Sequence, residues 1–116
     1  MQFMALIYNA EGSDANYEGG MQQIMADYYK FGEEARAAGV MVAGDALEAV
    51  STATSVRIRD GETSLTDGPF AETKETLGGY YLLECKDLDE ALKWAAKIPT
   101  AKYGTIEVRP VMVFDN

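Results

Sequence analysis

The densest group of side chains capable of chemistry in this chain lies in the stretch DGPFAETKE, residues 67–75. Three carboxylates, those of Asp67, Glu72 and Glu75, occur there together with the amine of Lys74. Carboxylates that face one another can share a proton or bind a hard cation, and a lysine beside them can balance their charge or neutralise an anionic ligand. The spacing of Glu72 and Glu75 is also typical of a solvated helical turn near Lys74, where surface carboxylates contribute little. Both interpretations stay open.

Asp67 and Phe70 each allow a structural and a functional interpretation. Asp67 precedes Gly68-Pro69, so its carboxylate could accept backbone N–H bonds and fix the turn. It could also lie at the mouth of a cavity as an acid, a base or an anchor for a ligand. Phe70 could pin the loop into the core, or its ring could stack on a ligand. Asp67 is therefore a candidate catalytic residue and Phe70 a candidate ligand contact.

Further candidate site residues lie on the expected strands. Strand tyrosines are usually core residues with a hydrogen-bonded hydroxyl, but a phenol directed into a cavity can transfer a proton, and Tyr8 is the second catalytic candidate on that ground. The expected hairpin places Arg57 opposite Ser64, which leaves its guanidinium free to meet a ligand carboxylate. The candidate ligand-binding residues are Arg57, Phe70, Glu72, Lys74, Glu75 and Tyr81.

Missing residue types exclude several kinds of site. The chain has no histidine, which excludes a Ser-His-Asp or Cys-His arrangement and a His-ligated zinc site. Its single cysteine, Cys85, cannot form an internal disulfide, and in an apolar strand it is expected to be an inert core thiol that fits a reducing cytoplasm. Neither GxGxxG nor a Walker sequence occurs. We expect no cofactor and no metal, so proton transfer would have to use Asp, Glu, Tyr, Lys or the cysteine.

Length and charge narrow the function classes. With 116 residues, 47% of them hydrophobic, the chain is expected to form one domain over 1–116. It has 19 acidic and 10 scattered basic residues, a net charge of −9, which argues against nucleic-acid binding. No apolar run is long enough for a transmembrane helix, and the first residues lack the basic region of a signal peptide. We expect a cytoplasmic protein that binds neither nucleic acid nor membrane.

The hydrophobic pattern predicts a β-α-β-hairpin-β-α-β order. Strands are expected at 2–8, 40–43, 79–85 and 106–114, a hairpin at 55–66, and helices at 21–38 and 88–98. Two βα repeats around an inserted hairpin are typical of an α+β, ferredoxin-like fold, with an antiparallel sheet and both helices on one face.

Local signals place three element boundaries. Asp60-Gly61 favours a two-residue type I′ turn, which would set Arg59 opposite Glu62. Asp87 is expected to cap the second helix, with Glu90 three residues later. The buried stripe of that helix is expected to comprise Leu88, Ala91, Leu92, Ala95 and Ile98.

The first expected strand is apolar on both faces. Phe3, Ala5 and Ile7 would point to one side and Met4, Leu6 and Tyr8 to the other. Two helices can cover only one face of the sheet, so the other face needs a second cover. A second copy of the same sheet would supply it, which predicts a homodimer.

Several stretches together resemble the YCII-related family, in particular its DGPF-motif branch. The stretches are DGPFAETKE, LGGYYLLEC, DLDEALKWAAKIP, IEVRPV and, upstream, STATSVRIRDGE. The resemblance implies a ferredoxin-like fold that dimerises as an α/β barrel, without a firmly assigned activity. It also implies a regulatory alternative, because members of this branch are often encoded near, or joined to, extracytoplasmic-function sigma factors.

Some members of the wider family are similar to enzymes, one of them dechlorinating, that are thought to use a His-Asp pair. This chain has no histidine, so that mechanism does not transfer, and Asp67 is the one suspected site residue that matches by motif. The leading hypothesis is a small-molecule-binding dimeric α/β barrel, with carboxylate or tyrosine acid-base chemistry in a cavity under the DGPF loop. The alternative is an interaction module that docks a sigma factor.

Overall fold

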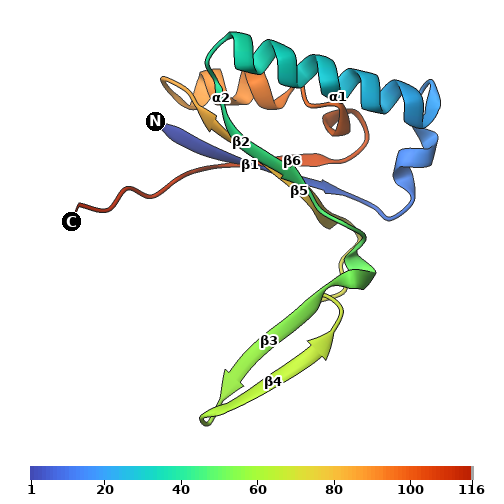
Figure 1. Cartoon of the computed structure of the whole chain (residues 1–116), viewed down its shortest axis with the longest axis vertical. Helices are drawn as coiled ribbons and strands as arrows, with labels where there is room; N and C mark the ends of the chain where they lie inside the picture. Colours follow the sequence, from blue (N-terminus) through green and yellow to red (C-terminus); the bar gives the residue numbers. More distant parts are fainter. Residues whose placement is uncertain (116) are drawn as a thin grey trace.

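The body of the protein is a four-stranded antiparallel sheet with two helices on one face, seen in the computed structural model, which describes residues 1–115 (Figure 1). The elements are β1 (Gln2–Asn9), η1 (Ser13–Asn16), α1 (Gly20–Ala37), β2 (Met41–Ala46), η2 (Val50–Thr52), β3 (Thr54–Arg59), β4 (Glu62–Asp67), β5 (Thr76–Glu84), α2 (Leu88–Ala95), η3 (Pro99–Lys102) and β6 (Thr105–Pro110). The strand order is β2-β5-β1-β6, so each helix crosses between two strands of the sheet. This arrangement confirms the α+β, ferredoxin-like fold.

One face of the sheet is buried and the other is open. Alternate residues of β1, namely Phe3, Ala5 and Ile7, are buried under the helices, and Leu83 of β5 lies opposite Phe3. The helix side adds buried residues such as Phe31, Ala35, Ala91 and Ile98. On the other face the half-buried residues are Met4, Leu6, Tyr8, Tyr80 and Leu82. The strand alternation therefore builds one complete core and leaves the other sheet face without a cover in the described chain, where Glu107 and Arg109 of β6 lie beside Leu6 and Met4.

Strands β3 and β4 pair only with each other and project away from the body (Figure 1). We call this hairpin, residues 54–67, the arm. Its register sets Arg59 opposite Glu62 and Arg57 opposite Ser64, as predicted. Asp60 and Gly61 have φ values of 53° and 78°, so both take the positive φ that a type I′ turn requires.

Helix α2 confirms its predicted cap but corrects its predicted buried stripe. The Asp87 side chain accepts the N–H of Glu90 at 2.9 Å, and the Glu90 carboxylate accepts the N–H of Lys86 at 3.0 Å. Leu88 and Leu92, however, are 46% and 47% exposed. The helix has only eight residues and reaches the sheet through Ala91 and Ala95, so the predicted apolar stripe is wider than the buried one.

Two strand limits also differ from the prediction. The last strand ends at Pro110 rather than at residue 114, and one further hydrogen bond, from the Val111 N–H to the Gln2 carbonyl at 2.9 Å, brings its pairing to the start of β1. The second strand runs to Ala46, three residues beyond its predicted end at residue 43. Within residues 1–115, no helix is long and apolar enough to cross a membrane.

The close packing at the start of β6 generates a stability prediction. A Cβ atom at Gly104 would collide with the carbonyl oxygen of Tyr8 and would lie 2.9 Å from the Thr100 methyl group. We expect Gly104→Ala to lower the free energy of unfolding by about 3 kcal/mol, because a backbone oxygen cannot move aside. Denaturant unfolding followed by the fluorescence of Trp94, the single tryptophan, measures the change.

Gly78→Ala is the matched control for this change. A Cβ there meets the Asn9 side chain at 3.4 Å and the Ile7 carbonyl oxygen at 4.0 Å, both within ordinary contact range. We expect its effect to be much smaller than that of Gly104→Ala. Equal effects of the two substitutions would contradict the steric explanation.

Candidate functional site

The DGPF loop, residues 68–75, is mostly exposed and contains no helix, which corrects the helical turn considered for Glu72 and Glu75. Asp67 ends β4 and is exposed. The bend after it is held by Gly68, whose φ is 97° and whose N–H donates to the Ala53 carbonyl at 2.7 Å. The Ser55 hydroxyl donates to the Gly68 carbonyl at 2.8 Å. The backbone and Ser55, rather than the Asp67 carboxylate, therefore supply the hydrogen bonds at this bend.

Phe70 does not pin the loop into the core, because it is 79% exposed. This corrects the structural interpretation of Phe70 and leaves its ring available to another molecule. Glu72, Lys74 and Arg57 are exposed as well, and they lie on the loop and on the arm rather than around one cavity. The structure therefore does not gather the predicted site residues within one chain.

Two of the predicted residues share a neighbour, Thr105, at the end of β1 on the open face of the sheet. Tyr8 pairs with Thr105 of β6, and the Thr105 hydroxyl donates to the Glu75 carboxylate at 2.8 Å. Tyr81 lies on the helix-facing side instead, where its ring is 5.0 Å from that of Phe31. Burial raises the pKa of Tyr81, which keeps its phenol neutral. Tyr8 and Glu75 thus share a region that Tyr81 does not join.

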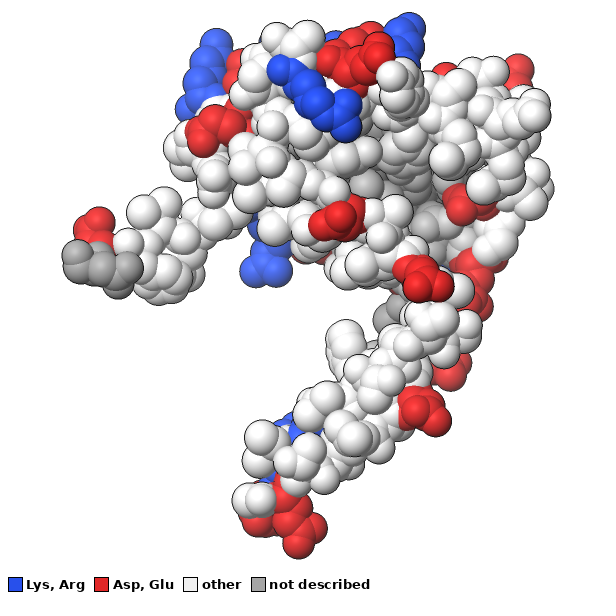
Figure 2. Space-filling model, in the orientation of Figure 1, with Lys and Arg blue, Asp and Glu red and all other residues white. Residues whose placement is uncertain are grey.

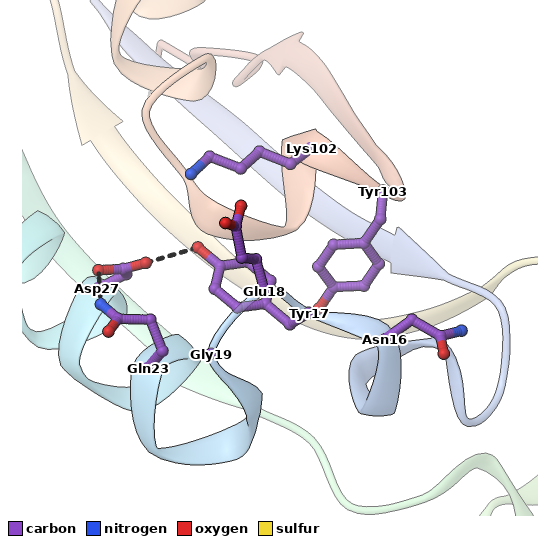
Figure 3. A pocket seen from close by; sticks show the side chains of 8 residues that line it. All are labelled: Asn16, Tyr17, Glu18, Gly19, Gln23, Asp27, Lys102 and Tyr103. Carbon is purple, nitrogen blue, oxygen red and sulfur yellow. Dashed lines mark hydrogen bonds between the residues drawn. The ribbon is translucent and has the colours of Figure 1, made fainter.

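A hollow lies elsewhere, between the start of α1 and η3 (Figure 3). It measures about 510 Å³, within the roughly 300–1,000 Å³ typical of small-molecule sites. Its lining includes Tyr17, Gln23, Asp27, Lys102 and Tyr103. We call it the Tyr17 hollow, and none of the predicted site residues lines it.

A phenol–carboxylate pair forms one wall of the Tyr17 hollow. The Tyr17 hydroxyl donates to Asp27 at 2.6 Å, and the Gln23 amide donates to the other Asp27 oxygen at 2.8 Å (Figure 3). The hydrogen bond to Asp27, followed by burial, raises the pKa of Tyr17 to about 12. The same bond, with that of Gln23, lowers the pKa of Asp27. At neutral pH the pair is a neutral phenol bound to an ionised carboxylate.

A second phenol–carboxylate pair lies beside the first. The Tyr103 hydroxyl donates to Asp14, and the Tyr103 ring meets that of Tyr17 edge-on with centroids 5.8 Å apart. Burial, followed by the hydrogen bond to Asp14, raises the pKa of Tyr103. Asp14 also accepts the side-chain amide of Asn9 at 3.2 Å, which ties the pair to the end of β1.

The second pair continues into the protein as a chain of hydroxyl groups. Thr100 is 3.4 Å from the Tyr103 hydroxyl and is also hydrogen-bonded to the hydroxyl of Tyr28. Burial raises the pKa of Tyr28, so this phenol also stays neutral. Polar groups inside a protein favour one arrangement when each has a partner, and this chain holds Tyr103 at the edge of the hollow.

Lys102 supplies the positive charge of the Tyr17 hollow. Its amine lies 5.6 Å from the centre of the Tyr17 ring, and its charge contributes to the lowered pKa of Asp27 (Figure 3). A second hollow of about 320 Å³ shares Tyr17, Asp27 and Lys102 and also meets Lys30 and Lys97. The two hollows together offer carboxylates, neutral phenols and ammonium groups to a small polar molecule.

The sequence reasoning missed these residues because their partners are far apart in the chain. Tyr17 and Asp27 are separated by 10 positions, and Asp14 and Tyr103 by 89. The one local signal is the polar, glycine-containing segment before α1, which holds Asp14 and Tyr17. Cys85 behaves as expected: it is buried, and burial raises the pKa of its thiol. Within residues 1–115, no group of three or more Cys, Asp or Glu side chains is arranged to hold a metal ion.

Comparison with known proteins identifies the family. A model of the YCII-related domain matches residues 1–115. The chain belongs to the YCII-related family. An uncharacterized protein of Rhizobium meliloti (strain 1021) is 37% identical over 121 residues, covering 98% of this chain and 94% of the relative.

A solved structure supports the fold assignment. It is 5-chloro-2-hydroxyhydroquinone dehydrochlorinase (TftG) from Burkholderia phenoliruptrix AC1100, in complex with 2,5-dihydroxybenzoquinone. It aligns with a TM-score of 0.57 at 16% identity and covers 97% of this chain and 94% of its own. At this identity the likeness shows that the two chains share a fold.

The Tyr17–Asp27 bond makes a prediction about alkaline pH. The raised pKa means that folding favours the neutral phenol, so its stabilising effect is complete below pH 10 and is lost as the pH rises toward about 12. Asp27→Asn keeps an acceptor oxygen but removes the charge, so we expect Tyr17 to ionise at a lower pH than in the wild type. The ultraviolet absorbance of tyrosinate measures this titration.

Asp89→Asn is the control, because it removes an exposed carboxylate from the first turn of α2, outside the Tyr17 hollow. We expect its tyrosine titration to match that of the wild type. Superimposable curves for Asp27→Asn and Asp89→Asn would show that Asp27 does not set the pKa of Tyr17.

Proposed function

We propose that the protein binds a small organic molecule in the Tyr17 hollow. One observation carries the proposal: the Tyr17–Asp27 pair, the Tyr103 phenol and the amine of Lys102 line a hollow of about 510 Å³. Core tyrosines need only one hydrogen-bond partner each, so structural needs alone do not account for the carboxylates of Asp27 and Glu18 and an ammonium group around the same space. Convergent polar groups around a hollow of this size are typical of ligand sites.

The polar groups favour a ligand that carries hydroxyl or carbonyl oxygens. Hydroxyl groups of a ligand can donate to the carboxylate of Asp27 or to a phenol oxygen, and a carbonyl or ionised oxygen can accept from Lys102. The TftG structure contains 2,5-dihydroxybenzoquinone, a small ring with both kinds of oxygen. A hydroxylated or quinone-like ring is therefore our first choice of ligand class.

The same groups set the form that acid-base chemistry would take. The raised pKa of Tyr17 and of Tyr103 keeps both phenols protonated, so they act as donors rather than bases. A proton released by an acidic ligand hydroxyl would pass to a carboxylate, and Lys102 would stabilise the oxyanion that is left. The lowered pKa of Asp27 makes it a weak base, so this chemistry suits acidic hydroxyl groups.

A second candidate site lies under the DGPF loop, on the open face of the sheet, within a proposed homodimer. Tyr8, Thr105 and Glu75 meet there, and the Tyr80 hydroxyl donates to Asp45 at 2.7 Å on the same face. A second copy packed sheet to sheet would close this open face into a cavity and would form the dimeric α/β barrel. The apolar residues Met4, Leu6 and Leu82, half-buried on that face, favour such a cover.

Two expectations from the sequence keep the status of proposals. We propose that residues 1–116 act as one domain in a reducing cytoplasm, which a buried free thiol at Cys85 fits. A docking role for an extracytoplasmic-function sigma factor is the alternative function. The exposed apolar residues of the arm and the DGPF loop are the surface that such a partner would use.

The Tyr17 hollow is tested with the ligand class it favours. We expect wild-type protein to bind 2,5-dihydroxybenzoquinone in a calorimetric titration, and Tyr17→Phe to weaken binding by about tenfold through the loss of one hydrogen-bond partner for a ligand hydroxyl. Tyr29→Phe is the matched control, because it removes a phenol hydroxyl from a 69% exposed residue of α1 outside the hollow. Equal affinity in Tyr17→Phe and wild type would remove Tyr17 from the site.

The two candidate sites are separated by substitutions at Asp67. Its exposed carboxylate is not part of the hydrogen bonds that hold the bend, so we expect Asp67→Asn and Asp67→Ala each to change the free energy of unfolding by less than about 0.5 kcal/mol. Binding lost in both variants, with Tyr17→Phe unaffected, would assign the ligand to the cavity under the DGPF loop. Binding kept in both would assign it to the Tyr17 hollow.

A further inference from the structure

The arm has one apolar face that nothing in the described chain covers. Val56, Ile58 and Leu65 share this face and are 61%, 65% and 67% exposed. The opposite face carries polar residues such as Arg57 and Ser64. Clean alternation of this kind is typical of a sheet with one packed face and one solvated face. In Figure 2 most of the visible surface of the arm is uncharged, with acidic residues along its edge and at its tip.

The arm also has little to hold it together by itself. β3 and β4 pair only with each other, and an isolated two-stranded hairpin is marginally stable in water. The three large apolar residues contribute to stability only when another surface removes them from water. The residue pattern of the arm is therefore typical of a hairpin that packs against another surface, whereas in the single chain the hairpin is uncovered.

The surface of the whole chain shows how large the missing cover is. The accessible surface is 8268 Å², whereas a folded monomer of 12.7 kDa is expected to expose about 6,200 Å². The radius of gyration is 16.2 Å, compared with about 13 Å for a compact chain of this length. The excess surface of about 2,000 Å² per chain exceeds the roughly 800 Å² that each partner buries in a standard interface and fits an obligate homodimer.

We propose that the apolar face of the arm packs on a second copy of this chain and clasps it. The inference rests on the homodimer proposed above, but it assigns the interface to a different element from the sheet face. Each copy presents the open sheet face and, beyond its edge, the arm, with a notch between arm and body in Figure 2. A two-fold dimer uses the same surfaces of both copies, so one contact would cover both arms and both open faces.

The clasp would also position the DGPF loop. The loop begins where β4 ends, at Asp67 and Gly68, so an arm fixed on the partner fixes the base of the loop. Phe70, exposed in the single chain, would then lie close to the dimer interface. The candidate cavity under the loop would in this way depend on the second copy for both its cover and its shape.

The test replaces the apolar face while preserving the hairpin. The variant Val56→Thr, Ile58→Thr, Leu65→Thr keeps residues that favour strands and removes most of the apolar contact. We expect wild type to sediment as a dimer and this variant to have a dimer dissociation constant raised by about 100-fold or more, because centrally buried apolar contacts dominate interface energies. Trp94 fluorescence reports whether the body is still folded, since Trp94 packs against Phe31 in the core.

The matched control is Arg57→Thr, Arg59→Thr, Ser64→Thr, which makes three changes on the polar face of the same arm. We expect it to dimerise like wild type.

A crosslinking experiment tests the contact directly. A photocrosslinking residue is placed at position 58 in a mixture of isotopically light and heavy copies, and we expect it to link a light peptide to a heavy one, that is, peptides of two different copies.

Each failure has a distinct meaning. A monomeric wild type would overturn both the homodimer and the clasp. A wild-type dimer that is unchanged by the apolar-face variant, or crosslinks confined within one copy, would overturn the clasp alone. A dimer unaffected by the variant, together with loss of a sigma factor bound by wild type, would assign the arm to that partner instead.

Discussion

Burial of the β1–β5 pair under α1 and α2 is the interaction that the rest of the structure depends on. Phe3 and Leu83 lie opposite each other near one end of this pair and are almost completely buried, and Ile98 closes the layer from the helix side. Because strand side chains alternate, the same register that buries these residues forces Met4 and Leu82 onto the opposite face. The open face is thus a direct consequence of the same register that builds the core.

The candidate sites follow from where this sheet ends. At the end of β1, Asn9 reaches toward Asp14 on the helix side, while Tyr8 pairs with Thr105 toward the DGPF loop. Consecutive residues of one strand therefore serve two regions, one closed by the start of α1 and one left open. The Tyr17 hollow is complete within one chain. The region under the DGPF loop is open on one side in the single chain. The two regions can therefore be tested separately.

Local patterns predicted the elements well because they depend on short-range physics. The register of the arm follows from the backbone needs of Asp60-Gly61, and the start of α2 follows from the capping of Asp87. The buried stripe of α2 was predicted too wide, since apolar spacing does not say how much of a short helix the sheet can reach. The Tyr17 hollow could not be predicted, because Asp14 meets Tyr103 only after β6 has folded back beside β1.

The carboxylates of the DGPF stretch show why density of chemical groups in a sequence is weak support for a site. Glu72 and Lys74 are adjacent along the chain but exposed, and exposed charges in water interact weakly. Asp27 and Tyr17 come from different segments, yet their mutual hydrogen bond is strong enough to shift the pKa of both groups in opposite directions. Proximity created by the fold, with partial exclusion of water, is what changes the chemistry of a side chain. In the single chain Asp67, Glu72 and Lys74 do not meet that condition, because all three are exposed, and only a partner that excluded water from them would change their chemistry.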